Sequence, residues 1–281
     1  MTKRRIYVHG QQAHLDETIA SAIVISTHPE DDFEIIRDSK EWVNAAPEDF
    51  VLDVGEQYDN VRLFDHHQKS LPHTKENGSE CAATLVAQAF APWMFHDPKM
   101  AVMLEMVRVL DTMGPNQFKK RYFDLDQYTI PMGLAEMFEE APTETAKAFA
   151  KVIAKRRTIG EKMPSYLKWL EENSCNDNAV LVIESNTNEA FSPQDDRGLL
   201  EAQTRHAERE GSVMIYGFHR RNPDCRSLFR TALGEDLGYD LTKAKPEDEE
   251  FTHVNGFIQI FRPKDENEFK KLVKAAEPEK Q

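Results

Sequence analysis

The sequence predicts an α/β protein in two parts, a largely parallel N-terminal sheet flanked by helices and a smaller C-terminal α/β domain. In the first half of the chain, short apolar stretches alternate with longer stretches that have the apolar spacing of helices. This alternation is typical of a parallel sheet whose strands are joined by helices. At 281 residues, the chain also exceeds the usual size of a single domain.

Strands are predicted where apolar residues form short runs, and helices where apolar residues recur every three or four positions. The run that contains Ile6 and Val8 comes first, and the helical pattern DETIASAIVI follows it. In chain order, the expected elements of the first part are strand 5–8, helix 16–25, strands 33–37, 50–54 and 61–64, and helices 81–90, 100–110 and 143–173.

A polar stretch with turn residues, 171–178, is expected to separate the two parts. The predicted domains are therefore 1–175, a catalytic domain, and 176–281, a substrate-binding domain. The elements expected in the second domain are strand 179–183, helix 198–209, strands 212–216 and 226–232, a short helix 240–244, strand 256–261 and helix 266–276. The basic residues 155–157 are interpreted as a solvated turn of the long helix, with a strand-binding groove as the alternative, and the charged segment 245–250 as a loop.

Composition and charge exclude several classes of protein. Hydrophobic residues make up 40% and charged residues 30% of the chain, which is an ordinary globular composition. The formal charge of −14 argues against a broad basic face that binds duplex nucleic acid, although not against a nucleotide or a short single strand. No stretch has the apolar length of a membrane span, and the N-terminal residues are too polar for a secretory signal, so we expect a cytoplasmic protein.

The three cysteines, Cys81, Cys175 and Cys225, have no paired spacing. Neither a disulfide framework nor a zinc knuckle is therefore expected. Metal-binding residue types occur instead among the histidines and aspartates of the first part.

The first group of these, His9, His14 and Asp16, lies between the first strand and the first helix. Each residue also has an ordinary structural interpretation, since a histidine can end a strand and an aspartate can begin a helix. Their combination in one turn favours a metal site, because divalent cations such as Mn²⁺ accept mixed imidazole and carboxylate ligands.

Further candidates follow the later strands and one helix. Asp53 ends an apolar strand, and Asp65, His66 and His67 follow the next one. Open α/β sheets bind ligands at the carboxyl ends of their strands, which is where these residues are expected. Asp111 ends an apolar helix, where its charge opposes the helix dipole and calls for a partner such as a metal; solvent exposure is the alternative. The whole set predicts a two-metal hydrolase site.

The order of these motifs resembles that of the DHH phosphoesterase superfamily, and most closely its Myg-type branch (the melanocyte-proliferating-gene family of metal-dependent hydrolases and exonucleases). The resemblance to the superfamily rests on four motifs in succession: His9-x4-His14-x-Asp16, Asp53, Asp65-His66-His67 and Asp111-Thr112. The Myg-type branch is indicated by His9, His14, Asp16-Glu17, Asp53-Val54-Gly55, Tyr58-Asp59 and Phe64-Asp65-His66-His67-Gln68.

The resemblance implies two Mn²⁺ ions per chain, or Mg²⁺ in their place. His9, His14 and Asp53 would hold one ion, and Asp16, Asp53, His66 and Asp111 the other, with Asp53 bridging. Asp65 would support the site from behind, and His67 would contact the phosphate or assist the leaving group.

In the second domain, the resemblance implies substrate-binding residues Arg226, Arg230, His253, Asn255 and Gly256. Arginine suits this task because its guanidinium group can contact two phosphate oxygens. Surface arginines and a turn glycine remain the alternative interpretation. The glycine run common in the superfamily is absent, and Gln259-Ile260 stands where Myg-type proteins usually have more glycine.

The predicted function is therefore hydrolysis of phosphodiester bonds in nucleotides, short oligonucleotides or single-stranded nucleic acid, in the manner of an exonuclease, by metal-activated water. Two alternatives are a catalytically silent regulator that binds metal or nucleotide, and a small-molecule phosphoanhydride hydrolase. Zinc peptidase chemistry is disfavoured because the chain has no His-Glu-x-x-His helix. A homodimer is one expected assembly.

Overall fold

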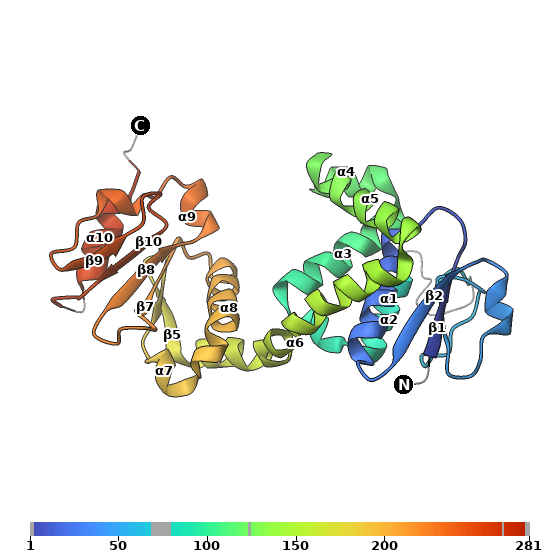
Figure 1. The fold of residues 1–281 in the computed structure, drawn as a ribbon. Coiled ribbons are helices and arrows are strands. Elements are labelled where there is room, and N and C mark those ends of the chain that lie inside the picture. The colour runs from blue at the N-terminus through green and yellow to red at the C-terminus, as the bar shows by residue number, and fades with distance from the viewer. Residues whose placement is uncertain (1–2, 69–79, 123–124, 266, 279–281) are drawn as a thin grey trace. The chain divides into compact units, whose positions relative to one another are not determined.

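A computed structural model of the chain describes residues 3–68, 80–122, 125–265 and 267–278. The chain divides into two compact units, Met1–Glu161 and Lys162–Gln281. The division falls within the long helix α6 (Pro142–Asn173), which is drawn in light green in Figure 1. It therefore precedes the polar stretch at which the sequence pattern places a boundary.

The sheet of the first unit is four-stranded and parallel throughout, as the sequence predicts. Its strands are β1 (Lys3–Val8), β2 (Asp32–Arg37), β3 (Phe50–Leu52) and β4 (Leu63–Phe64), in the order β2-β1-β3-β4. All of β3 is buried, which is expected of a strand between two neighbours in a sheet covered on its faces. The parallel order brings the carboxyl ends of all four strands to one edge.

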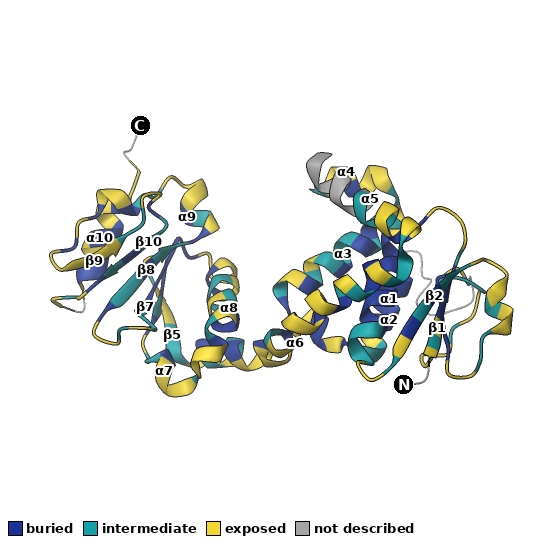
Figure 2. Ribbon diagram, viewed as in Figure 1, coloured by how far each residue is buried: buried dark blue, intermediate teal, exposed yellow. Residues whose placement is uncertain are grey.

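Helices supply the rest of the core of this unit. In α1 (Leu15–Thr27), every residue from Leu15 to Val24 is buried, and Figure 2 shows α1 and α2 (Ala82–Phe90) as largely buried helices. A helix that is buried on all sides is expected to be mostly apolar. The two buried carboxylates in its first turn, Asp16 and Glu17, are therefore exceptional. The remaining helices are α3 (Pro98–Met113), α4 (Pro115–Tyr122), α5 (Leu125–Glu140) and the first part of α6; η1 (Glu41–Asn44) and η2 (Pro92–Phe95) are short 3₁₀ helices.

The interpretation of residues 155–157 as a solvated basic turn is wrong for Arg156. This side chain is buried and forms a two-pronged pair with Asp97, with Nε 2.9 Å from Oδ2 and Nη2 2.9 Å from Oδ1. Asp97 also caps α3 by accepting the backbone N–H groups of Lys99 and Met100. A buried guanidinium group needs a negatively charged partner. Here the partner is 59 residues away in the sequence, so no local pattern indicates that Arg156 is buried.

The second unit contains a six-stranded mixed sheet in the order β5-β6-β7-β8-β10-β9. Only β6 and β7 run parallel among the described pairs, and the other neighbours are antiparallel. The strands are β5 (Ser174–Asp177), β6 (Val180–Ile183), β7 (Met214–Phe218), β8 (Arg226–Arg230), β9 (Glu249–Thr252) and β10 (Ile258–Phe261).

Helices lie on both faces of this sheet (Figure 1). Helix α10 (Glu268–Ala276) packs Phe269 and Leu272 against one face, in a cluster with Met214 and Leu228. On the opposite face lies α8 (Asp196–Arg209). The short helices are α7 (Thr187–Ala190), α9 (Ala232–Asp236), η3 (Pro193–Asp195) and η4 (Leu241–Lys243).

Two segments of this unit differ from the sequence prediction. The polar stretch 171–178, where turn residues are expected, ends α6 and then forms β5, which turns into β6 through Asn178 and Ala179 at positive φ angles. The expected loop at 245–250 contains the start of β9. Both strands lie at an edge of the sheet and are largely exposed, so their sequences are polar and lack the alternation by which strands are recognised. No helix in the described part of the chain is long and apolar enough to cross a membrane.

Candidate metal centre

The polar residues of the first unit converge at the carboxyl edge of its sheet. His9 follows β1, Asp53 follows β3, and Asp65 to His67 follow β4. Because these strands are parallel neighbours, their ends meet at the same edge. Helices α1 and α3 add further side chains, and the ligand-type atoms then form three overlapping groups.

The first group consists of His9, His14, Glu17 and Asp53, whose nearest ligand-type atoms all lie within 4.8 Å of one another. His9 Nε2 lies 2.5 Å from Glu17 Oε2 and 3.5 Å from Asp53 Oδ2. The rings of His9 and His14 meet edge to face, with their centroids 4.8 Å apart. Two imidazoles and two carboxylates thus surround a single point.

The second group consists of Asp16, His66 and Asp111, and a third joins His66 and His67 to Asp53. His66 Nε2 lies 3.2 Å from Asp111 Oδ2 and 4.0 Å from Asp16 Oδ2. It also lies 3.2 Å from Asp53 Oδ1. The two oxygens of Asp53 therefore face different groups, Oδ2 towards His9 and Oδ1 towards His66.

The backbone at Asp53 adopts an uncommon conformation, with φ at 57°. This left-handed region is uncommon for residues other than glycine, although aspartate adopts it more readily than most residues do. The Asp53 N–H still donates to the carbonyl oxygen of Phe64 in β4 at 3.0 Å, so the sheet ladder continues through the turn. The carboxylate is 3% exposed, and it lies between the two groups because the chain turns here instead of extending β3.

Asp16 is held by the beginning of helix α2. Its Oδ2 accepts the N–H of Ala82 at 2.8 Å, and its Oδ1 accepts the N–H of Ala83 at 2.7 Å. The first N–H groups of a helix have no partner within the helix and carry partial positive charge, so they suit a carboxylate. These contacts fix the orientation of Asp16. They join residues that are far apart in the sequence, so no local sequence pattern predicts them.

Asp65 holds His67 from behind. Its Oδ1 accepts both the ring Nδ1–H of His67 at 2.6 Å and the His67 backbone N–H at 3.0 Å, while Oδ2 accepts the N–H of Glu56 at 2.7 Å. Asp65 is buried, whereas the His67 side chain is 57% exposed. With Nδ1 bonded to Asp65, the ring presents Nε2 as its second polar atom.

Buried polar atoms that lack hydrogen-bond partners are concentrated at this site. Those among the described residues of the site are His9 Nδ1 and Nε2, both oxygens of Glu17, Asp53 Oδ1, His66 Nε2 and Asp111 Oδ2. Buried polar groups normally have hydrogen-bond partners. A cluster of such groups without them therefore suggests that the site binds a ligand or an ion. Carboxylates and imidazoles aimed at common points are the donors that divalent cations accept, so the residues present fit two such ions.

Charge repulsion and burial at the site appear directly in the pKa values. Burial, together with the charge of Asp53, raises the pKa of Glu17 to about 7, even though His9 acts to lower it. Burial and then Asp16 raise the pKa of Asp111 to about 8. Burial alone would lower the pKa of His66, but the Asp53 carboxylate beside it and the charges of Asp16 and Asp111 raise it to about 9. A bound cation would relieve this crowding of negative charge.

The structure thus brings together the predicted donors His9, His14, Asp16, Asp53, His66 and Asp111. Glu17 is the residue that sequence reasoning leaves out of the donor sets, because an acid in the first turn of a helix has an ordinary role there. Its burial is the missing signal: its side chain is wholly inaccessible to solvent, and the guanidinium group of Arg37 lies 3.9 Å from its carboxylate.

The predicted substrate-binding arginines of the second unit have partners within that unit. Arg226 lies over the ring of Phe218 at 3.6 Å from its centroid. Arg230 donates to the carbonyl oxygen of Tyr239 at 2.7 Å and pairs with Glu235 at 3.3 Å. Both side chains remain partly exposed, and their role in substrate binding stays a prediction.

The other predicted substrate-binding residues form the turn between β9 and β10. The N–H of Asn255 donates to His253 Nδ1 at 3.1 Å, and the N–H of Gly256 donates to the carbonyl oxygen of His253 at 2.8 Å. Gly256 has φ at 62°, and a Cβ atom there would lie 2.2 Å from Asp240 Oδ1. The conformation of the turn is therefore enough to explain why residue 256 is glycine. The role of Gly256 in binding a nucleotide stays a prediction.

Comparisons with known proteins match part of the chain. Residues 5–101 match the family model MYG1_exonuc, which is described as an uncharacterised protein family, UPF0160. This stretch runs from β1 into α3 and includes every donor named above except Asp111. No curated protein matches the chain.

Two solved structures are similar over nearly the whole chain. One is described as the pGpG-specific phosphodiesterase PggH from Vibrio cholerae, with 10% identity, 97% of this chain and 98% of that chain covered, and a TM-score of 0.28. The other is an uncharacterized protein from Helicobacter pylori G27, with 9% identity, the same coverage of 97% and 98%, and a TM-score of 0.24.

Proposed function

We propose that this protein is a metal-dependent phosphoesterase that uses two divalent cations to hydrolyse phosphodiester bonds of nucleotides, short oligonucleotides or single-stranded nucleic acid. The observation that carries the proposal is the position of Asp53, whose two carboxylate oxygens face different groups of imidazole and carboxylate donors. The family model that matches residues 5–101 bears an exonuclease label, which supports a nucleic-acid substrate.

The donors divide into two ligand sets. His9, His14 and Asp53 would hold one cation, with Glu17 beside them. Asp16, His66 and Asp111 would hold the other and share Asp53 with the first. Mn²⁺ suits such mixed nitrogen and oxygen donors, and Mg²⁺ is the alternative. Two cations held there would lower the pKa of a bound water and neutralise charge on the phosphoryl oxygens.

His67 is the residue proposed to handle the proton on the leaving group. The hydrogen bond that His67 Nδ1–H donates to Asp65 raises the pKa of His67 above its ordinary value, which favours the protonated ring. With Nδ1 held by Asp65, Nε2–H can donate to a phosphoryl oxygen or to the alcohol oxygen that departs. Asp65, which is buried and accepts three hydrogen bonds, keeps this ring in place.

Hydrolysis of labelled single strands tests the proposal. The purified protein is incubated with a labelled pentanucleotide and with a long single strand, in Mn²⁺ and in EDTA. We expect cleavage in Mn²⁺ alone, and loss of both cleavage and bound metal in Asp53→Ala. Glu30→Gln, an exposed acid outside the donor groups, is the matched control and should behave as the wild type.

Two results would count against different parts of the proposal. Two tightly bound cations with no turnover of either strand, of mononucleotides or of phosphoanhydrides would favour a silent regulator. Unchanged metal content in Asp53→Ala would overturn the shared-ligand assignment.

A further inference from the structure

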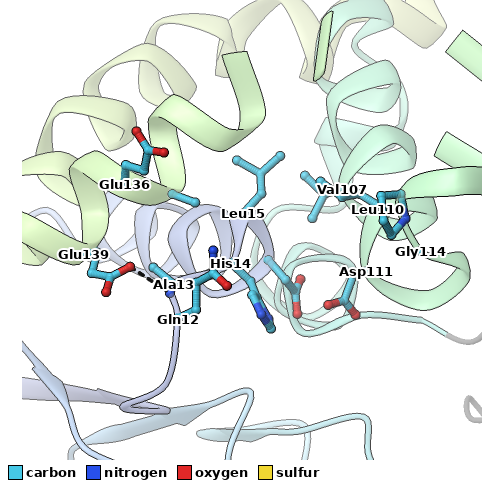
Figure 3. Close-up of a pocket in the computed structure, with 13 residues that line it drawn as sticks. Gln12, Ala13, His14, Leu15, Val107, Leu110, Asp111, Gly114, Glu136 and Glu139 are labelled. Atoms are coloured by element: carbon cyan, nitrogen blue, oxygen red, sulfur yellow. Dashed lines mark hydrogen bonds between the residues drawn. The ribbon is translucent and has the colours of Figure 1, made fainter. Parts of the chain in front are cut away.

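A cavity of about 440 Å³ lies in the first unit, between three helices. Figure 3 shows it bounded by the N-terminal end of α1, the C-terminal end of α3 and the C-terminal half of α5. This volume is within the range of about 300–1,000 Å³ that is typical of small-molecule sites. The cavity is therefore large enough for an organic group and is not merely a packing defect.

The cavity is continuous with the candidate metal centre. Its lining includes His14, Asp16 and Asp111, which also belong to the donor groups. In Figure 3, His14 and Asp111 lie at one end of the cavity and the side chains of α5 at the other. A phosphate bound at the metal centre would thus have its attached group at the mouth of this cavity.

The walls of the cavity are apolar, and its rim is acidic. Leu15, Val107 and Leu110 form the apolar part, and the exposed carboxylates of Glu136 and Glu139 border the far end. Among the described lining residues there is neither a lysine nor an arginine. Such a lining disfavours a second phosphate, because anions need positive partners, and it favours an uncharged and partly apolar group.

We propose that this cavity binds the nucleoside attached to the reacting phosphate, with its base between α1, α3 and α5. The choice of a nucleoside rests on the proposed function, while the preference for an uncharged group comes from the lining itself. A nucleoside has a flat base, which apolar side chains can cover. Its sugar and base also carry O–H and N–H groups, which can donate hydrogen bonds to the carboxylates at the rim. Further phosphates on the same nucleoside would meet Glu136 and Glu139 and be repelled.

Binding of free nucleosides tests the proposal without any catalytic step. Ligand-observed NMR in EDTA measures the binding of adenosine and guanosine to the whole chain, with ribose 5-phosphate as the ligand that lacks a base. We expect both nucleosides to bind and ribose 5-phosphate not to bind. Ala135→Phe, which places a ring in the cavity, should weaken nucleoside binding at least tenfold.

A charge reversal at the rim provides a second test that does not disturb the core. Glu136 is exposed, so Glu136→Lys is expected to fold normally. It should increase binding of adenosine 3′,5′-bisphosphate relative to adenosine 5′-monophosphate severalfold, because a cation then replaces an anion beside the second phosphate. Glu140→Lys is the matched control, since Glu140 is exposed on the same helix and does not line the cavity.

The outcomes separate this proposal from the proposed function. The cavity proposal is overturned if no nucleoside binds at millimolar concentration, or if Ala135→Phe binds nucleosides as well as the wild type does. An equal effect of Glu136→Lys and Glu140→Lys would overturn the role of the rim. Nucleoside binding without Mn²⁺-dependent hydrolysis would instead sink the proposed enzyme and leave a nucleoside-binding cavity.

Discussion

Asp53 has a backbone conformation and a buried charge that are both unusual for a residue in a folded protein. Its φ of 57° lies in the left-handed region, which is uncommon for residues other than glycine, although aspartate adopts it more readily than most. Its carboxylate is buried next to Asp16, Glu17 and Asp111, where like charges repel. His9 and His66 offset part of this repulsion, and the position of Asp53 between the two donor groups explains both features.

Asp53→Asn therefore separates stability from metal binding. The substitution keeps the side-chain shape and removes one buried negative charge, so the metal-free protein should be at least as stable as the wild type, by up to about 1 kcal/mol. Mn²⁺ should no longer raise the unfolding temperature. Thermal unfolding in EDTA and in Mn²⁺ measures both effects, and marked destabilisation in EDTA would contradict the prediction.

Glu17 is expected to position His9. Its Oε2 lies 2.5 Å from His9 Nε2, and no other described residue of the first donor group approaches that nitrogen as closely. Glu17→Gln should weaken Mn²⁺ binding by about 10- to 100-fold, the usual effect of losing a group that orients a ligand. Metal titration of this variant and of the exposed control Glu41→Gln makes the comparison, and equal affinities would exclude the role.

The individual donors could be predicted from sequence because strand ends and residue types are local features. His9, Asp53 and His66 follow apolar runs that any parallel sheet places at one edge. The role of Glu17 could not be predicted, because it depends on complete burial of a helix whose first turn looks like an ordinary acidic start. The contacts of Arg226 with Phe218 and of Arg230 with Tyr239 could not be predicted either, because they depend on how the chain folds.

Among the elements, helix α6 is anchored to the first unit by a buried ion pair. Arg156 and Asp97 are about 5% and 0% exposed, and Asp97 also caps α3. Removal of one partner of such a pair leaves an unpaired buried charge, which costs far more than the loss of an exposed pair. The same helix carries an exposed pair, Lys147 with Asp32, at 2.9 Å.

Asp97→Ala should therefore destabilise the first unit by about 3–5 kcal/mol. Asp32→Ala, which breaks the exposed pair on the same helix, should produce little measurable change. Urea unfolding of both variants in EDTA gives the comparison. Equal effects would mean that burial does not determine the contribution of this pair.

The second part of α6 is joined to η3 through Asp195. Its Oδ1 accepts hydrogen bonds from Lys162 Nζ at 2.6 Å and from Tyr166 Oη at 2.7 Å, and Oδ2 accepts from Ser192 Oγ at 2.8 Å. Although burial acts to raise the pKa of Asp195, these hydrogen bonds outweigh it and hold that pKa well below its usual range.

This depressed pKa predicts a pH-dependent contribution to stability. The unfolded chain binds a proton at Asp195 near pH 4, whereas the folded chain does so only at lower pH, so the stabilisation is present above about pH 4 and is lost as pH falls further. Asp195→Asn should cost about 2 kcal/mol at pH 7 and less at pH 3. Urea unfolding at both pH values checks this, and a constant difference would contradict it.

The sequence predicted the central strands and the longest helix to within a few residues, whereas helices α4 and α5 and the edge strands β5 and β9 were missed. Helix α4 has one buried residue, Phe118, and begins at Pro115 directly after Gly114, which has φ at 79°. Edge strands β5 and β9 are polar because most of their residues face solvent. Tertiary contacts define these elements, so no local periodicity marks them.

On the scale of the whole molecule, the proposed chemistry belongs to one of the two units. Every donor in the groups of imidazoles and carboxylates lies within Met1–Glu161, as does the cavity beside them. The second unit, Lys162–Gln281, has its own sheet and its own apolar cluster. Binding of cations should therefore act on the stability of the first unit.

Removal and addition of metal test this division of roles. A ligand that binds only the folded state stabilises it by about 2.7 kcal/mol at 100 times its dissociation constant, which corresponds to about 100-fold slower hydrogen exchange of amides that exchange through unfolding. We expect Mn²⁺ to slow exchange in β1 and α1, whereas β7 and β8 keep the rates measured in EDTA. The variant Asp53→Asn should show no difference between Mn²⁺ and EDTA. If Mn²⁺ slowed exchange equally in both units, cation binding would have to involve the second unit as well, and the assignment of both ligand sets to the first unit would fail.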